Sequence, residues 1–335
     1  MRFGLIGCGT HANWAVIPAL QAVAPRCELV AVADTNAANL AALNLPGVAR
    51  FADHRQMLAG ARLDAVYIAT LADSHAQLAL DALAAGLHVV CEKPMAMSVD
   101  ECRQMLAAAA HAQRLLTVNF ESRYHPELRQ VRAWIAAGHL GRVEAVHIQQ
   151  LWDGHKIHGE IGARRRRLVE LAGGLDCGIH KSDLARYFVG GRWQEIIARG
   201  RWFGETVSQP PHIAILAGLD NGVLVTLNAS LGYGAQMKAK AFSEAFTVVG
   251  DRGVINCFND RLAQPALVRL HSDDLEAEVP MEEPGHADVM RLMLRDFADT
   301  AEGRTAPPEL ASGEDGLQAQ FFVDEANRQA VAHRV

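Results

Sequence analysis

A lysine in an unusual setting is the first candidate for chemistry. The apolar run from His88 to Cys91 ends in Glu92-Lys93-Pro94, and a short apolar run of this kind is typical of a strand buried on both faces of a parallel sheet. Most isolated lysines at strand ends are solvated. Pro94, however, fixes its own backbone and restricts that of Lys93, which favours a side chain held in one direction. Lys93 is therefore a candidate for handling a proton.

A second candidate group lies in segment 173–184. If this segment is helical, Asp176, His180 and Asp183 stand at positions i, i+4 and i+7 and share one face. A carboxylate one turn before an imidazole can fix the tautomer of the ring and stabilise its protonated form, as a general base requires. The alternative interpretation is a helix N-terminus rich in acids that contains one histidine. A cofactor site elsewhere in the chain would favour the acid-base interpretation.

A glycine-rich turn near the N-terminus predicts such a site. Residues 7–12 are Gly-Cys-Gly-Thr-His-Ala, between a predicted strand and a predicted helix. Glycines let the backbone approach a pyrophosphate, and the helix N-terminus offers unpaired N–H groups. Asp34 ends the second predicted strand, where a carboxylate can accept hydrogen bonds from the adenosine ribose and would repel a 2'-phosphate. The pattern favours NAD over NADP, although an acid at this position does not strictly exclude NADP.

The dinucleotide site gives Lys93 a location. Ligands bind parallel sheets at the carboxyl ends of the strands, and Lys93 follows the predicted strand 89–91. Beside an oxidised nicotinamide, an ammonium would lose its proton more readily because of the like charge. Lys93 could then share or accept the proton of a substrate hydroxyl.

The hydrophobic pattern predicts the elements that position these groups. Apolar runs predict strands at 3–6, 29–33, 65–69 and 89–91, separated by amphipathic helices. Ser74 and Gly86 are predicted to cap one helix, and Ser98 with Glu101 forms a capping box for the next. Alternating strands and helices predict an α/β Rossmann domain with a doubly wound parallel sheet, over residues 1–121.

The remaining chain, residues 122–335, has a different pattern. Longer alternating segments at 143–152, 195–203, 212–219, 223–231, 242–249 and 254–258 predict strands, and Asp220-Asn221-Gly222 predicts a hairpin turn. Helical patterns cover 126–137, 174–189, 287–302 and 314–332. This order predicts an α+β domain with an open, mainly antiparallel sheet. The last helix could pack back on the first domain.

Composition narrows the class of protein. The chain has 335 residues, 50% of them hydrophobic and 21% charged, with a net charge of −6. No broad cationic surface is expected, so nucleic acid is not an expected partner. The six cysteines form no Cys-x-x-Cys pair, and no long apolar segment or signal peptide is evident. We expect a cytoplasmic protein with no membrane partner.

The three motifs together resemble the glucose-fructose oxidoreductase and inositol dehydrogenase family (Gfo/Idh/MocA). The resemblance extends to 119–126 and to Ser312-Gly313-Glu314-Asp315-Gly316. It implies a Rossmann domain, then a substrate-binding domain whose open sheet forms homodimers or homotetramers, and a proline in the motif that is often cis, here Pro94. It also implies hydride transfer between the nicotinamide and the carbinol carbon of a sugar, sugar acid or cyclitol.

The resemblance also implies roles for individual residues. Lys93, Asp176 and His180 match the catalytic positions, with Lys93 and His180 at the substrate hydroxyl; which of them is the formal base stays open. The implied cofactor contacts are Gly7, Gly9, Thr10, His11, Ala12, Asp34, Thr70, Leu71, Ser74, His75, Glu92, Lys93, Pro94 and Asn119. The implied substrate contacts are Arg123, Tyr124, Trp152, His155, Arg165, Asp176 and His180.

Two residues differ from the family pattern, and one segment carries additional basic residues. Leu71 stands where a proline is common, and Ala172 replaces the first glycine of a Gly-Gly-Gly run. The segment 152–167 carries His155, His158 and four arginines; arginine forks would suit an acidic sugar, although a solvated loop or an interface strip is an equal alternative. No metal is predicted, because the two histidines lack a third ligand.

Three functions remain in competition. The first is an NAD(P)-dependent dehydrogenase acting on a CH–OH group. The second is a glycosidase or epimerase that recycles a bound NAD, as some members of the resembled family do. The third is a nucleotide-binding regulator without catalysis, since a fold alone does not set function. The presence of Lys93, Asp176 and His180 argues against the regulator.

Overall fold

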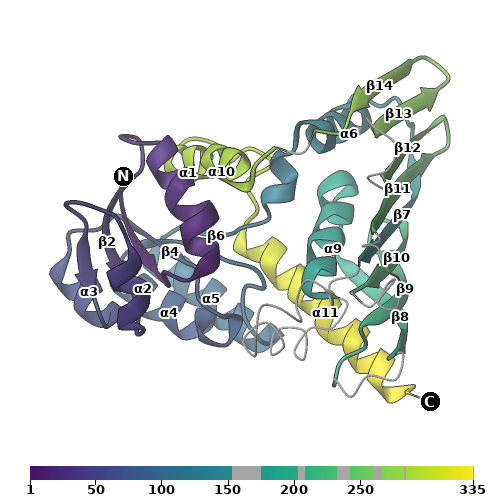
Figure 1. Ribbon diagram of the computed structural model, residues 1–335. Helices are drawn as coiled ribbons and strands as arrows, with labels where there is room; N and C mark the ends of the chain where they lie inside the picture. Colours follow the sequence, from purple (N-terminus) through teal and green to yellow (C-terminus); the bar gives the residue numbers. More distant parts are fainter. Residues whose placement is uncertain (153–174, 203–207, 232–241, 260–265, 283, 335) are drawn as a thin grey trace. The chain divides into compact units, whose positions relative to one another are not determined.

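The computed structural model describes residues 1–152, 175–202, 208–231, 242–259, 266–282 and 284–334 (Figure 1). The chain divides into two compact units. Unit 1 contains Met1–His125 and Glu283–Gln320, and unit 2 contains Pro126–Glu282 and Phe321–Val335. The observed division falls four residues after the predicted boundary at residue 121. Residues 283–320 belong to unit 1 in the structure, whereas the sequence placed them in the second domain.

Unit 1 contains a parallel sheet of six strands, which confirms the Rossmann prediction. The strands are β1 (Arg2–Ile6), β2 (Glu28–Ala33), β3 (Ala49–Phe51), β4 (Ala65–Ile68), β5 (His88–Cys91) and β6 (Leu116–Val118), in the order β3-β2-β1-β4-β5-β6. The connections contain η1 (Ala12–Val16, a π-helix), α1 (Ile17–Ala22), α2 (Ala37–Ala42), α3 (His54–Gly60), α4 (Ala72–Ala84) and α5 (Val99–Ala112). The strand order reverses beside β1, where such sheets bind nucleotides.

The helix caps in unit 1 follow local sequence, with one exception. The Ser98 hydroxyl accepts a hydrogen bond from the Glu101 N–H at the start of α5, as predicted. The Glu101 carboxylate accepts in return from the Met97 N–H, one residue earlier than in a standard capping box. Ser74 is not an N-cap, because α4 already begins at Ala72 and the Ser74 hydroxyl donates to the Leu71 carbonyl instead.

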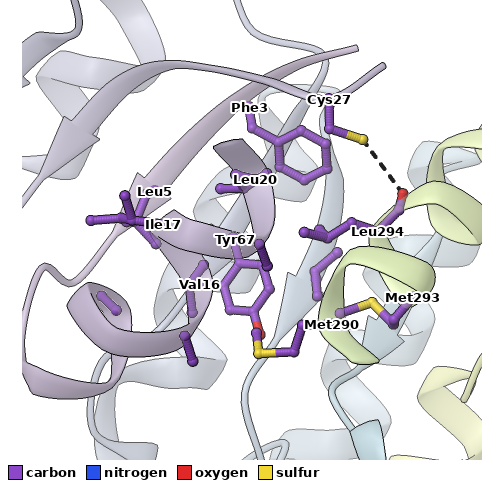
Figure 2. Packing of buried hydrophobic residues seen from close by; sticks show 14 of the residues in the cluster. Phe3, Leu5, Val16, Ile17, Leu20, Cys27, Tyr67, Met290, Met293 and Leu294 are labelled. Atoms are coloured by element: carbon purple, nitrogen blue, oxygen red, sulfur yellow. Dashed lines mark hydrogen bonds between the residues drawn. The ribbon is translucent and has the colours of Figure 1, made fainter. Parts of the chain in front are cut away.

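Helix α10 (His286–Ala301) belongs to unit 1 because it completes the hydrophobic core of that unit. Its buried face carries Val289, Met290, Met293, Leu294, Phe297 and Ala298. These side chains join one cluster with Phe3, Leu20 and Tyr67 (Figure 2). Apolar burial of this extent stabilises a helix position far more than any surface contact.

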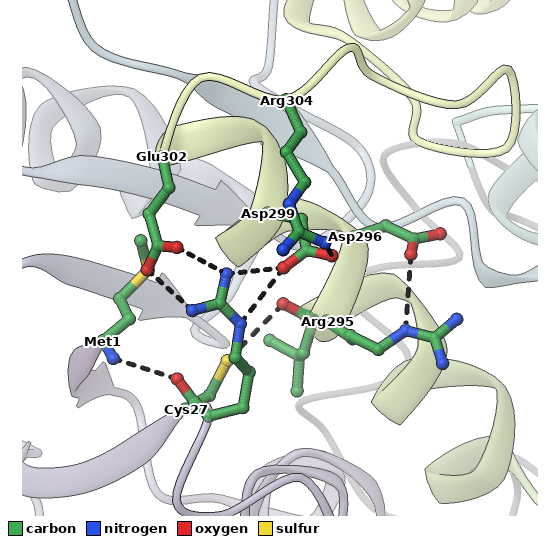
Figure 3. A network of polar contacts seen from close by, with 9 residues as sticks. Met1, Cys27, Arg295, Asp296, Asp299, Glu302 and Arg304 are labelled. Carbon is green, nitrogen blue, oxygen red and sulfur yellow. Dashed lines mark hydrogen bonds and ion pairs between the residues drawn. The ribbon is translucent and has the colours of Figure 1, made fainter.

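Polar contacts at the end of α10 reinforce the same packing. The Arg26 guanidinium donates to the carboxylates of Asp299 and Glu302, and Arg304 pairs with Asp299 as well (Figure 3). The terminal amine of Met1 donates to the Arg26 carbonyl. The N-terminal segment is thereby fixed to a helix that lies about 270 residues later in the chain.

Unit 2 is a mainly antiparallel sheet of eight strands, as predicted. The strands are β7 (Val143–Trp152), β8 (Trp193–Arg201), β9 (His212–Leu219), β10 (Leu224–Ser230), β11 (Phe242–Gly250), β12 (Gly253–Asn259), β13 (Leu267–Ser272) and β14 (Glu276–Pro280). Their order is β14-β13-β12-β11-β7-β10-β9-β8, and only the β7–β10 pair is parallel. Strands β13 and β14 were not predicted.

Helices cover one face of this sheet. They are α6 (Pro126–Ala136), α9 (Leu175–Val189) and the second part of α11 (Gly313–Ala332), which begins in unit 1 (Figure 1). The side chains of β9 alternate strictly between buried and more exposed positions, as expected for a sheet with one covered face. Within the described part of the chain, no helix has both the length and the apolar character to cross a membrane.

Candidate active site

The turn after β1 has the geometry of a pyrophosphate-binding turn. Gly7 adopts a φ of 93°, and a Cβ at this position would lie 2.8 Å from the carbonyl carbon and oxygen of Ala69. Only glycine fits both conditions. Burial, with a further effect of the Asp34 carboxylate, raises the pKa of the Cys8 thiol to about 12, so the cysteine in this turn stays protonated and is not a nucleophile.

Asp34 lies at the carboxyl end of β2, where the ribose of a dinucleotide is expected. One carboxylate oxygen accepts from the Cys8 N–H at 2.8 Å and from the Asn39 side-chain amide at 2.9 Å. The other accepts from the Asn36 N–H at 2.7 Å. These bonds fix the carboxylate beside the glycine turn, and the remaining lone pair on the oxygen that accepts from Asn36 can accept a ribose hydroxyl.

Glu92 is the centre of a hydrogen-bonded cluster at the carboxyl ends of the strands. Its Oε1 atom accepts from Tyr67 Oη at 2.7 Å, Asn119 Nδ2 at 2.8 Å and His11 Nε2 at 2.9 Å. Burial alone would raise the pKa of this carboxyl, but His11 and the hydrogen bonds outweigh it and lower the pKa. Glu92 is therefore a buried, ionised carboxylate at neutral pH.

The sequence did not indicate the contribution of Tyr67 to this cluster. A tyrosine inside the apolar strand β4 was a usable signal, because a buried phenol needs a hydrogen-bond partner. Burial and the neighbouring Glu92 raise the pKa of Tyr67 well above its usual range. The phenol consequently remains a donor at all physiological pH values.

A second set of contacts supports the backbone at Lys93. The Lys93–Pro94 peptide bond is cis, as the family resemblance implied. His75 Nδ1 lies 2.8 Å from the Pro94 carbonyl oxygen, and its Nε2 lies 3.3 Å from that of Thr70. Burial lowers the pKa of His75, and a neutral ring donates from only one nitrogen; the shorter contact favours donation to Pro94. The Thr70 and Ser74 hydroxyls share a further hydrogen bond of 2.7 Å, and Ser74 bonds to the Leu71 carbonyl.

In unit 2, the predicted acid-base residues lie on one helix. Asp176, His180 and Asp183 are all part of α9, which confirms the helical spacing on which the prediction depended. His180 is partly exposed and Asp183 is buried. The neighbouring Lys181 forms a partly buried ion pair with Glu244 of β11, which fixes this part of α9 to the sheet.

Other predicted substrate contacts fall elsewhere. Trp152 is the last residue of β7, while His155 and Arg165 lie outside the described residues. No group of three or more metal-binding side chains occurs among the residues that the structure describes. That no metal is bound stays a prediction.

Arg123 and Tyr124 are buried inside unit 1, in η2 (Glu121–Tyr124). Arg123 donates to the Pro308 carbonyl and to the Asp315 carboxylate. This contact joins the two additional segments of the family resemblance, 119–126 and 312–316. Tyr124 lies in the hydrophobic core, and burial with the nearby Asp296 raises the pKa of its phenol. The substrate contacts expected at Arg123 and Tyr124 stay predictions, and the contacts that the structure shows for these side chains lie inside unit 1.

The fold, together with the glycine turn, Asp34 and Glu92 at the carboxyl ends of the unit 1 strands, defines a dinucleotide-binding Rossmann protein with a second, antiparallel domain. Two family models match the chain. The model of an oxidoreductase family with an NAD-binding Rossmann fold, GFO_IDH_MocA, matches residues 1–120, and that of the GFO/IDH/MocA C-terminal domain matches residues 128–256. The chain belongs to the Gfo/Idh/MocA family of oxidoreductases, and its cofactor is NAD.

Two relatives match this chain over nearly its full length. The chain is 29% identical to a 1,5-anhydro-D-fructose reductase of Ensifer adhaerens, over 94% of this chain and 92% of the relative. It is 27% identical to an inositol 2-dehydrogenase of Rhizobium meliloti, over 100% and 98%. An oxidoreductase of Agrobacterium radiobacter, solved with NAD+, L-tartaric acid and magnesium, has the same fold, with a TM-score of 0.83 at 21% identity over 100% and 97% of the chains.

Proposed function

We propose that the chain is an NAD-dependent dehydrogenase of a secondary hydroxyl or hemiacetal group in a sugar, sugar acid or cyclitol. The observation that carries the proposal is the cluster at Glu92, which supports Lys93 at the carboxyl edge of the nucleotide-binding sheet. The names of the relatives, which act on anhydrofructose and inositol, support the same substrate class.

The residues at this edge fit the cofactor. Gly7 leaves space for the pyrophosphate, and Asp34 offers acceptors to the ribose and disfavours a 2'-phosphate, so NAD is preferred to NADP. Asn119 is 1% exposed, and its amide oxygen has no hydrogen-bond partner in the described structure. A buried acceptor without a partner is costly, and a bound amide donor would satisfy it. Bound NAD supplies the hydride acceptor.

We assign the proton of the substrate hydroxyl to Lys93 and His180, with Asp176 orienting the imidazole. Lys93 is the ammonium at the end of β5, and His180 stands one helical turn after Asp176. The oxidised nicotinamide disfavours a second positive charge nearby, so the lysine can release or share its proton more readily. The two groups are coupled, so the role of base is assigned to the pair and not to either residue alone.

The test is a screen of sugars, sugar acids and inositols with NAD and NADP, followed by absorbance of the reduced cofactor. Substitutions Lys93→Ala and His180→Ala should each lower kcat by about two orders of magnitude while NADH still binds. His111→Ala, at an exposed position in the last turn of α5, is the matched control. Near-normal rates in either active-site variant would contradict the assignment.

The same screen separates the competing functions. Net release of NADH supports a dehydrogenase. Bond cleavage or isomerisation without net NADH would indicate a glycosidase or epimerase that recycles its cofactor, and NADH binding without turnover of any substrate would indicate a regulator. The predicted cytoplasmic location stays a prediction.

We also propose that the face of the unit 2 sheet opposite α9 forms a homodimer or homotetramer interface. Large apolar side chains on that sheet are exposed: Ile197, Leu216, Leu224 and Phe258, the last at 60%. Ile197 and Leu216 are cross-strand partners, so two of these apolar side chains lie next to each other on the exposed face. Light scattering should show a dimer or tetramer, and the double substitution Ile197→Glu with Leu216→Glu should give a monomer. A wild-type monomer at micromolar concentration would refute the interface.

A further inference from the structure

The Glu92 carboxylate joins four segments of unit 1 that are far apart in sequence. Tyr67 comes from β4, Asn119 follows β6, and His11 lies at the start of the helix after the glycine turn. The second carboxylate oxygen accepts from the backbone N–H of Lys93 at 3.3 Å. The position of the Lys93 backbone therefore depends on the same carboxylate that holds the glycine turn.

Among these donors, His11 is the one whose charge can change near neutral pH. The Tyr67 phenol stays protonated, and amides do not titrate. The charged groups around His11 are Glu92 and Lys93 at the end of β5 and Glu121 in η2; His286 at the start of α10 lies 3.4 Å from Glu121. The Trp14 ring contacts the imidazoles of both His11 and His286 edge-on.

We propose that His11 is a proton-dependent positioning residue: its imidazolium holds Glu92, and through it the Lys93 backbone, in the arrangement that binds NAD and transfers the hydride. The proposal rests on the proposed function, because it assumes that NAD binds at this edge. It adds a residue whose role is not chemical but electrostatic. Deprotonation leaves a buried carboxylate with neutral donors only, and the carboxylate is then held less firmly.

The electrostatics have the sign that this role requires. Burial alone would lower the pKa of His11, but attraction to Glu92, a hydrogen bond to it and attraction to Glu121 together raise the pKa, against repulsion from Lys93. The imidazolium is accordingly favoured at lower pH and lost as pH rises through the raised pKa. A positive charge at a helix N-terminus is unfavourable for the helix, so a bound pyrophosphate would relieve this repulsion and favour the protonated form.

The experiment is an NADH fluorescence titration of the full chain between about pH 6 and about pH 9. We expect the wild-type Kd to rise about fivefold over this range, because the loss of one partly exposed charge interaction has an effect of about this size. His11→Gln keeps a donor to Glu92 but has no titrating charge, and its Kd should change less than about twofold. The matched control is His139→Gln in unit 2, where a histidine pairs with Asp274 at 3.0 Å; it should show the wild-type pH dependence.

A positioning role also predicts how catalysis responds. The kcat of His11→Gln with a substrate from the screen should change less with pH than the wild-type kcat in the same range, and the dependence that remains belongs to Lys93 and His180. His11→Ala removes the donor and should weaken both NADH binding and kcat more than His11→Gln does, so the glutamine variant is a partial rescue. A role that depends only on the hydrogen bond, and not on the charge, would leave the pH dependence of His11→Gln equal to that of the wild type.

A measurement on the wild type keeps the proposal testable if the variants do not fold. NMR titration of the His11 imidazole should show that saturating NADH raises its pKa, since a proton that promotes NADH binding must itself be bound more tightly in the complex. An imidazole whose titration is unaffected by NADH, or a His11→Gln variant with the wild-type pH dependence, would overturn the role of His11 while leaving the proposed function intact. A wild type that binds no NADH at any pH would instead refute the proposed function and, with it, this role.

Discussion

Replacement of Leu294 by alanine tests whether α10 is part of the nucleotide-binding unit. Leu294 is 0% exposed and packs in the cluster that contains Phe3, Leu20 and Met290 (Figure 2). The substitution removes three carbon atoms from this core, about 2.4 kcal/mol at about 0.8 kcal/mol each. The cavity left behind adds to this, so we expect a loss of about 3–4 kcal/mol. For a unit of this size, that lowers Tm by roughly 10 °C.

Differential scanning calorimetry, with and without NADH, is the appropriate assay. A two-unit protein can unfold in more than one step, and the transition that NADH raises identifies unit 1. Leu292→Ala is the matched control, because it changes the same residue type in the same helix at a partly buried position; we expect a loss of roughly 1 kcal/mol. If Leu294→Ala lowers only the transition that NADH does not shift, or if both variants behave alike, the assignment of α10 to unit 1 is refuted.

Three further predictions concern unit 1. Gly7→Ala should weaken NADH binding at least about tenfold in fluorescence titrations, because the added Cβ meets the Ala69 backbone at a positive φ. Arg26→Ala should destabilise the unit by about 1 kcal/mol at low salt and by less at high salt, measured by urea unfolding, because its partners on α10 are partly exposed. Glu92→Gln should lower the stability of the unit at neutral pH. Since the folded state lowers the Glu92 pKa, this stabilisation is present above the ordinary value of 4.5 and is lost as pH falls through the lowered pKa; the Tm difference between wild type and variant should therefore shrink in acid.

The sequence predicted the parts of the fold that local patterns determine. Continuous apolar runs identified β1, β2, β4 and β5, since a strand buried on both faces needs an apolar side chain at every position. Asp220-Asn221-Gly222 does connect β9 to β10, with Gly222 at a φ of 86°. These features depend on a few neighbouring residues, so one sequence is enough to find them.

Three of the strands that were missed, β3, β6 and β14, have weak local patterns. Strand β3 has three residues that are largely exposed, and β14 alternates glutamates with small or apolar residues at the edge of its sheet. An edge strand is stabilised mainly by pairing with its neighbour, and the pairing partner is not encoded in the strand itself. Strand β6 is buried but only three residues long, which is too short for periodicity to distinguish it from a loop.

The sequence predicted helix α10 but could not predict in which unit it packs. The spacing of Val289, Met290, Met293, Leu294 and Phe297 identifies an amphipathic helix correctly, and the predicted range of 287–302 is one residue from the observed one. An apolar face, however, packs against any core of suitable shape. The choice of unit 1 depends on Phe3, Leu20 and their neighbours, almost three hundred residues earlier, and on the Arg26 ion pairs. Such a choice is a property of the folded chain.

Some features of the candidate site follow from local sequence patterns, and others depend on contacts between distant residues. Parallel strands bring their carboxyl ends to one edge, so the sequence could place Gly7, Asp34 and Lys93 together without any knowledge of their contacts. It could not pair His11 with Glu92, 81 residues away, because the motif at residues 7–12 treats position 11 as any residue. Yet a buried carboxylate needs compensating partners, and only the structure shows that one of these partners is a histidine. The pH dependence of His11→Gln therefore tests the part of the site that the motif leaves unspecified, separately from the part that it predicts.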